Sequence, residues 1–203
     1  MIKFEEFTGG VFDTNCFLLR GPGGNVLIDA PQGADERFEQ EHIDVLLLTH
    51  GHFDHVADAA AIVRRHGCAL YHHADTAPMI TDPDFYRKWS FALEVEPVAG
   101  GLLLGETVAF EVAGLQFAVL EVPGHCPGSL CFYFAEDGVL FGGDVLFNGS
   151  VGRTDLPGGD HDLLIKGILE KILPLPDATV VLSGHGPATT VGRERASNPF
   201  LPH

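Results

Sequence analysis

Three imidazoles and one carboxylate lie within six consecutive residues of this chain, in the sequence Thr-His-Gly-His-Phe-Asp-His at positions 49–55. The preceding residues 44–48, Asp-Val-Leu-Leu-Leu, form a short apolar run that predicts a buried strand. Side chains two positions apart on an extended segment point the same way, so His50 and His52 can face one point. Imidazoles crowded in this way repel one another when protonated, unless they share a cation. The sequence therefore predicts a metal site, and imidazole with carboxylate suits zinc, iron or manganese.

Three later strands are expected to end as this one does, in a turn of small residues that carries one possible ligand. Residues 117–122 lead through Pro-Gly to His125, and residues 139–141 lead through Gly-Gly to Asp144. Residues 180–182 lead through Ser-Gly to His185. Strand ends meet at the edge of a sheet, where functional side chains are commonly placed. The candidate metal ligands are therefore His50, His52, Asp54, His55, His125, Asp144 and His185.

These seven side chains exceed the needs of one tetrahedral zinc ion, but they fit two metals that share a bridging ligand. Asp144 is the natural bridging carboxylate. Asp29 ends the strand expected at residues 25–28, where it could accept a hydrogen bond from a ligand imidazole or could be a turn residue. The remaining histidines lack this context and are expected at the surface: His42, His66, His72, His73, His161 and His203.

The rest of the chain is expected to alternate between strands and helices. Hydrophobic patterning predicts a first meander at residues 2–7, 14–20 and 25–28, and a second at 107–112, 115–122, 129–134 and 139–141. Further strands are expected at 69–71 and 179–182, and helices at 34–41, 55–66 and 161–173. Residues 75–101, with prolines and aromatic residues, predict one short helix within irregular chain. Their aromatic side chains are expected to pack on the body of the protein, the alternative being a wall of a substrate cleft or a subunit contact.

The acidic charge of the chain excludes some partners. Lys and Arg number 12 against 28 Asp and Glu, which gives a net charge of −16. This composition offers no basic footprint for nucleic acid and repels anionic membranes. The N-terminus lacks the apolar stretch of a signal peptide, and no apolar run approaches the roughly 18 residues of a membrane span. We therefore expect a cytoplasmic monomer or homodimer with one domain over residues 1–203 and with free thiols at Cys16, Cys68, Cys126 and Cys131.

Four motifs together resemble the metallo-β-lactamase superfamily: Thr-His-Gly-His-Phe-Asp-His, Gly-His-Cys-Pro-Gly-Ser, Gly-Gly-Asp and Ser-Gly-His-Gly-Pro. They occur in the family's order and span nearly the whole chain. The resemblance implies an α/β (α+β) fold, a four-layer αβ-βα sandwich in which two mixed sheets pack face to face with helices outside. The two expected meanders and their flanking helices agree with this architecture.

Within the superfamily, residues 144–155 are similar to the glyoxalase II branch, the hydroxyacylglutathione hydrolases, which include short single-domain bacterial members. That resemblance implies a first metal on His50, His52 and His125. It implies a second metal on Asp54, His55 and His185, with Asp144 as the bridge. Arg153 stands where glyoxalase II has a basic residue for the carboxylate on the thiol side of its substrate, the alternative being a surface ion pair.

The chain departs from the glyoxalase II pattern at three places. Cys126 follows His125 where the family usually has Thr, and Ala57 with Asp58 replaces a common Gly-Gly pair. Only residues 186–203 follow His185, so the helical C-terminal substrate domain of full-length glyoxalase II is expected to be absent. The resemblance therefore does not carry over glutathione specificity.

The expected function is a metal-dependent hydrolase that cleaves an S-2-hydroxyacyl thiol such as S-lactoylglutathione. Two divalent ions, zinc with iron or manganese as the alternatives, would lower the pKa of a bridging water, and the resulting hydroxide would attack the thioester carbonyl. Asp54 is the expected catalytic carboxylate, which accepts the proton and aims the nucleophile. The only expected partner is the small-molecule thioester.

The main alternative is a persulfide dioxygenase, a related group to which Gly-Arg-Thr-Asp at residues 152–155 is similar. Such an enzyme would use one iron on His50, His125 and Asp144, with open positions for oxygen. True β-lactamases fit less well, because some use Cys at the position of Asp144 and others lack a bridging carboxylate. A lactonase and a non-catalytic metal-binding scaffold are the remaining alternatives.

Overall fold

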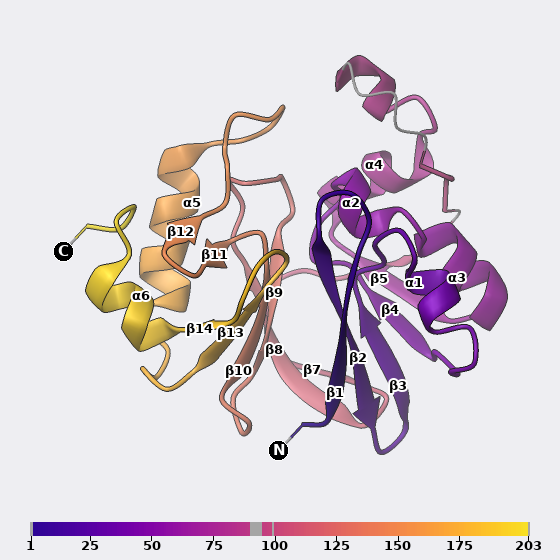
Figure 1. Ribbon diagram of the computed structural model, residues 1–203, viewed down its shortest axis with the longest axis horizontal. Coiled ribbons are helices and arrows are strands. Elements are labelled where there is room, and N and C mark those ends of the chain that lie inside the picture. The colour runs from indigo at the N-terminus through magenta and orange to yellow at the C-terminus, as the bar shows by residue number, and fades with distance from the viewer. Residues whose placement is uncertain (1, 90–94, 99, 203) are drawn as a thin grey trace.

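The chain folds into two mixed β-sheets that pack face to face (Figure 1). The computed structural model describes residues 2–89, 95–98 and 100–202. Across the first sheet the strands run β1 (Phe4–Gly9), β2 (Thr14–Gly21), β3 (Gly24–Ile28), β4 (Val45–Leu47), β5 (Ala69–His72) and β6 (Leu102–Leu103). Across the second they run β14 (Thr189–Thr190), β13 (Val180–Ser183), β10 (Val139–Gly143), β9 (Leu130–Phe134), β8 (Leu115–Glu121) and β7 (Thr107–Val112).

Both sheets are buried on two faces, as β2 illustrates. Phe17 and Leu19 point into the core between the sheets, where they meet Phe117 and Phe132 of the second sheet. The alternate residue Leu18 points into the core beneath the helices of the first sheet. Successive side chains of a strand point to opposite faces, so a strand that is buried on both faces is apolar at every position. The central strands therefore appear in the sequence as short continuous hydrophobic runs.

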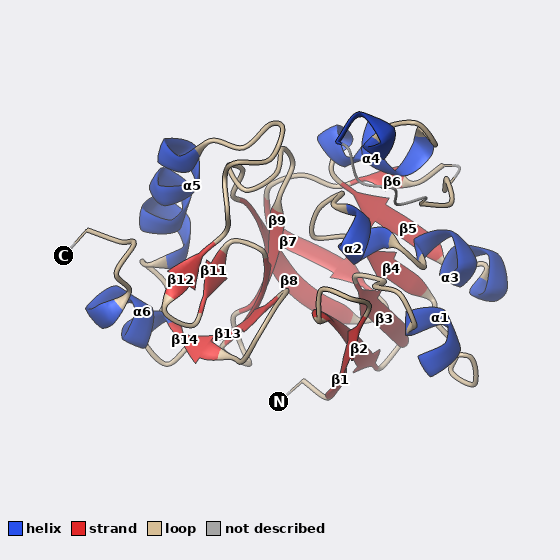
Figure 2. Cartoon of the chain, turned by 45° about the horizontal axis from the view of Figure 1, so that its top comes forward, coloured by secondary structure: helices blue, strands red, loops and turns tan. Residues whose placement is uncertain are grey.

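Helices cover the two outer faces and complete the four-layer sandwich that the sequence predicts (Figure 2). The first sheet is covered by α1 (Ala34–Arg37), α2 (Phe53–Val56), α3 (Ala59–His66) and α4 (Ala77–Thr81). The second sheet is covered by α5 (His161–Gly167), which continues as the π-helix η3 (Ile168–Ile172), and by α6 (Val191–Ser197). Within the described residues, no helix has both the length and the apolar composition needed to cross a bilayer.

Both predicted meanders are confirmed, but several element boundaries were wrong. The helix expected at 55–66 is broken, because the backbone N–H of Asp58 donates to the carbonyl of Ala30 at 2.9 Å instead of continuing the helix. The helix expected at 34–41 ends at Arg37. Four short strands and one helix were not predicted: β6, β11 (Leu146–Phe147), β12 (Ser150–Val151), β14 and α6.

The expectation that His72 lies at the surface was wrong. His72 ends β5 and is 3% exposed, and its Nδ1 donates to the carbonyl of His73 at 2.8 Å. It lies two residues after the buried Leu70, so the alternation of the strand places both side chains on one face. The cysteines agree with the prediction, since all four are buried free thiols.

Residues 75–101 hold more helix than the sequence predicts. The 3-10 helices η1 (Ala74–Thr76) and η2 (Tyr86–Trp89) flank α4. Tyr86 is buried against the ring of Phe53, with ring centroids 5.9 Å apart, so this aromatic residue packs on the body as expected. The expectations for Phe91 and for the side chain of Trp89 lie outside the described residues.

Candidate metal centre

All seven predicted ligands converge where the ends of the two sheets meet. His50 follows β4, His125 follows β8, Asp144 follows β10 and His185 follows β13, as the strand-end pattern predicts. The remaining three lie at the start of α2, whose N-cap residue is His52 in an extended conformation. Three groups of possible ligands have all their ligand atoms within 4.8 Å of one another: His50 with His52 and His125, His50 with His55 and Asp144, and Asp54 with His55 and His185.

The Asp144 carboxylate lies between two groups of histidines, a first group of His50, His52 and His125 and a second group of His55 and His185. Its Oδ2 is 3.4 Å from Nε2 of His125 and 3.3 Å from Nε2 of His185. Its Oδ1 is 3.3 Å from Nε2 of His55. One carboxylate therefore contacts members of both groups, which is the placement that a bridging ligand requires.

The site leaves buried polar atoms without hydrogen bonds, and this fits a metal centre. Among the described residues, no hydrogen-bond partner is found for Nε2 of His50, His55 and His125 or for Oδ1 of Asp144, all of which are buried. An unsatisfied buried polar atom costs about 1–3 kcal/mol. Several such atoms aimed at one space are stabilised together when they ligate cations, so the residues present suit two metal ions.

The other ring nitrogen of each of four histidines is held by a hydrogen bond, which leaves Nε2 available as a ligand. His50 Nδ1 donates to Thr49 Oγ1 at 3.1 Å, His55 Nδ1 to Asp29 Oδ2 at 2.8 Å, His125 Nδ1 to the Arg153 carbonyl at 2.8 Å, and His185 Nδ1 to the Phe12 carbonyl at 3.0 Å. Asp29 therefore accepts from a candidate ligand imidazole, as the first of the two readings of this residue predicts. It also accepts from the hydroxyl of Thr49 at 2.7 Å, so it supports both sides of the centre.

Close approach of backbone to side chain explains the glycines of the strand-end turns. A Cβ at Gly184 would collide with Oδ1 of Asp144 and with the ring of His55. Gly143 has a φ of +49°, and a Cβ there would lie 2.8 Å from Oγ1 of Thr49. These turns therefore need glycine for space as well as for backbone conformation.

The electrostatics of the two histidine groups differ. Burial and the neighbouring imidazoles of His55 and His52 lower the pKa of His50 well below its usual value, so this ring is neutral and ready to ligate. Burial would also lower the pKa of His185, but its contacts with Asp144 and Asp54 outweigh burial and raise it to about 10. Around His185, therefore, the carboxylates of Asp144 and Asp54 stabilise positive charge, whereas no such effect dominates at His50.

The Asp29→Asn variant is expected to bind the metal on His55 about 10–100-fold less tightly, because a neutral amide no longer orients and polarises this imidazole. Asparagine tolerates the φ of +61° at this position, so the backbone is retained. Competition with a coloured chelator measures the affinity. Asp44→Asn is the matched control, since Asp29 accepts the backbone N–H of Thr49 at 2.8 Å and Asp44 likewise accepts that of Asn25 at 2.8 Å, outside this site. Equal affinities in the two variants would contradict the assignment.

Five of the seven side chains line a cavity of about 580 Å³, hereafter the metal cleft. Its walls include His52, Asp54, His125, Asp144 and His185. The lining also includes residues of the β11–β12 hairpin and residues after it, among them Arg153. Arg153 is exposed and makes two 2.7 Å hydrogen bonds to the Asp155 carboxylate, so the ion pair considered as the alternative is present. A contact of Arg153 with substrate stays a prediction.

One supporting residue, Glu194 of α6, escaped the sequence analysis, which did not predict this helix. Glu194 is fully buried, and its Oε2 accepts from the backbone N–H of Gly149 at 2.9 Å and from Nδ2 of Asn198 at 2.8 Å. The same Asn198 amide donates to the carbonyl of Ser150 at 3.0 Å. Helix α6 thus holds the tip of the hairpin that walls the metal cleft. The threonine that caps α6, Thr190, is the only local signal for it.

Glu194→Ala is expected to lower the free energy of unfolding by about 3 kcal/mol, because it leaves the buried hydroxyl of Thr189 and one buried amide hydrogen of Asn198 without their acceptor. Urea denaturation of the metal-free proteins measures the loss. The control is Glu170→Ala, which removes an exposed carboxylate of η3 and should change stability by less than about 0.5 kcal/mol. Equal stability of the two variants would refute the role of Glu194.

Comparison with known proteins points to one family. A profile described as Metallo-beta-lactamase superfamily matches residues 9–185. The chain is 37% identical to the hydroxyacylglutathione hydrolase GloC of Haemophilus influenzae over 198 residues, which cover 94% of this chain and 93% of that protein. Its structure is similar to that of the BLEG-1 B3 metallo-beta-lactamase, with a TM-score of 0.90, 37% identity, and coverage of 99% of this chain and 100% of that one. It is also similar to TTHA1623 in a di-iron-bound form, with a TM-score of 0.85, 38% identity, and coverage of 97% and 100%.

Proposed function

The chain belongs to the metallo-beta-lactamase superfamily as a metallo-hydrolase, and we propose that its substrates are S-2-hydroxyacyl thiols such as S-lactoylglutathione. The observation that carries the proposal is the position of Asp144, whose carboxylate contacts both histidine groups at the floor of an open cleft. The similarity to GloC, a hydroxyacylglutathione hydrolase, supports a thioester as the substrate.

The proposed ligands are the seven residues that converge at the end of the two sheets, with His50, His52 and His125 on the first metal and Asp54, His55 and His185 on the second. Asp144 serves both. Zinc and iron both suit this set of donors, and TTHA1623 is a di-iron relative. Two such ions, when bound, supply a water acidic enough to lose its proton near neutral pH and an electrophile for the thioester carbonyl.

Asp54 is the proposed catalytic carboxylate. Its Oδ2 accepts from the hydroxyl of Thr14 at 2.9 Å and lies 3.3 Å from Nε2 of His185, so its orientation is fixed at the wall of the cleft. In that position it can take the proton of the attacking water. Water adds its oxygen to the acyl carbon, the carbon–sulfur bond breaks, and the products are a 2-hydroxy acid and a thiol. A thiolate is a good leaving group, so no separate acid is required.

The test is to load purified protein with zinc or with iron and to measure thiol release from S-lactoylglutathione. We expect turnover that is lost in His50→Ala. Thiol release no faster than in that variant would overturn the proposal. Nitrocefin hydrolysis is measured in parallel because of the similarity to a B3 metallo-beta-lactamase. One iron per chain with oxygen consumption on glutathione persulfide would instead establish the dioxygenase.

A further inference from the structure

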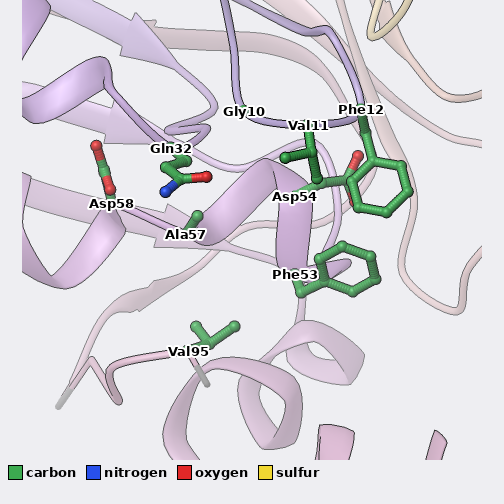
Figure 3. Close-up of a pocket in the computed structure, with 9 residues that line it drawn as sticks. All are labelled: Gly10, Val11, Phe12, Gln32, Phe53, Asp54, Ala57, Asp58 and Val95. Atoms are coloured by element: carbon green, nitrogen blue, oxygen red, sulfur yellow. The ribbon is translucent and has the colours of Figure 1, made fainter. Parts of the chain in front are cut away.

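A second cavity of about 210 Å³, hereafter the side pocket, adjoins the metal cleft (Figure 3). The two cavities share three lining residues, Phe12, Phe53 and Asp54. The rings of Phe12 and Phe53 stand edge to face with centroids 5.3 Å apart, at the border between the cavities. Asp54 is also a proposed metal ligand and catalytic carboxylate. The side pocket therefore lies beside the carboxylate proposed to act on the reacting carbonyl, and the aromatic pair borders both cavities.

The lining of the side pocket suits an uncharged hydrocarbon group. Val11, Ala57 and Val95 extend the apolar wall that the two phenylalanines begin, as Figure 3 shows. Among the described residues that line it, there is no Lys or Arg, and the only charged side chains are Asp54 and Asp58.

Both carboxylates are already held by the protein. Asp58 Oδ2 accepts from the backbone N–H groups of Gly33 at 2.8 Å and of Asp35 at 3.0 Å. Asp54 accepts from Thr14. Their negative charge disfavours an anionic ligand in the side pocket.

The metal cleft differs, because its lining includes Arg153, an exposed guanidinium that is paired with the Asp155 carboxylate. A thioester of a peptide-like thiol has one end with carboxylates and one end with an acyl substituent. Because the charges that line the two cavities differ, each cavity favours a different end of this thioester. The carboxylate end is favoured beside Arg153, and the acyl substituent is favoured beside Phe12 and Phe53. A cavity of about 150 Å³ already holds a benzene ring, so the side pocket has room for an aryl group or a short branched chain.

We propose that the side pocket binds the side chain of the acyl group and selects 2-hydroxyacyl thioesters with a large apolar substituent, such as a phenyl ring, over those with a methyl group. This inference rests on the proposed thioesterase function and makes it more specific. The selectivity comes from apolar contact, since one extra or missing methylene in a hydrophobic pocket already changes kcat/KM by about 10–200-fold.

Two probes with the same thiol and the same 2-hydroxyacyl core test the proposal: S-mandeloylglutathione, with a phenyl substituent, and S-lactoylglutathione, with a methyl substituent. For the wild-type protein we expect kcat/KM to be at least about tenfold higher for the mandeloyl compound. A ratio of one or less, with turnover of the lactoyl compound, would overturn the side pocket while leaving the thioesterase standing. Turnover of neither compound would overturn the proposed function, and with it this inference.

Ala57→Leu tests the location of the selectivity. Ala57 has helical backbone angles, φ −53° and ψ −43°, so leucine is compatible with the backbone there, and its larger side chain would fill the side pocket. The mandeloyl-to-lactoyl ratio is expected to fall at least about fivefold, with two metals still bound. Ala196→Leu, the same change on the exposed face of α6, should keep the wild-type ratio. An unchanged ratio in a metal-loaded Ala57→Leu protein would place the selectivity elsewhere.

Discussion

Asp144→Asn is expected to lower kcat/KM for thioester hydrolysis by about 1,000-fold or more and to reduce the bound metal from two equivalents to one or fewer. The amide keeps the shape of the side chain but removes the negative charge that lies between His55, His125 and His185. Without that charge, two cations held in one buried site repel each other with less compensation. A 1,000-fold loss corresponds to about 4 kcal/mol, which is within the several kcal/mol that a pair of metals contributes.

Metal content after dialysis and thiol release from S-lactoylglutathione measure the two effects separately. Asp162→Asn is the control, since it makes the same charge change at an exposed position in the first turn of α5. It should retain both metals and wild-type turnover. If Asp144→Asn kept two equivalents and its activity, the carboxylate would not be a bridge.

The convergence of the seven candidate ligands was predictable because it depends on a pattern that survives in the sequence. Buried strands appear as apolar runs, and their ends are marked by glycine turns, as before His125, Asp144 and His185. Each local signal is weak, but the repetition of one arrangement along the chain indicates a single sheet edge. The structure adds the reason for the repetition, since Gly184 and Gly143 leave the space into which Asp144, His55 and Thr49 pack.

The parts that were missed depend on contacts between distant segments, which no local pattern encodes. The helix break at Asp58 depends on a carbonyl at Ala30, and the burial of His72 depends on the close approach of Gly101, where a Cβ would collide with the imidazole. Helix α6 is short, and much of its support comes from a buried glutamate that binds the hairpin of residues 146–151. Sequence periodicity detects apolar faces, whereas these features depend on individual polar atoms finding partners.

The hairpin links α6 to a candidate metal ligand as well as to the cleft. Arg153 follows β12 by two residues, and its carbonyl accepts from Nδ1 of His125. Arg153 therefore has two roles: its side chain is a proposed substrate contact, and its backbone carbonyl orients the candidate ligand His125. Gly152 makes this possible, because a Cβ there would lie 2.9 Å from that of His125. Substitutions at Gly152 should affect metal binding and substrate binding together.

His185→Ala separates the two-metal hydrolase from the one-iron dioxygenase. In the proposed hydrolase His185 holds the second metal with Asp54 and His55, whereas the alternative site needs only His50, His125 and Asp144. We therefore expect one metal equivalent to be lost and thiol release to fall by about 100-fold, which corresponds to about 2.7 kcal/mol of transition-state stabilisation. Metal analysis and thioester turnover measure both.

The position of His185 allows this substitution without a large loss of stability. Its side chain is 28% exposed, so its removal opens space to solvent and leaves no sealed cavity in the core. His161→Ala, at an exposed site at the start of α5, is the matched control and should keep both metals. If His185→Ala instead retained one iron per chain and wild-type oxygen consumption on a persulfide, the second group would be dispensable. The chemistry would then belong to His50, His125 and Asp144 alone, and Asp54 would serve only to balance the charge of His185.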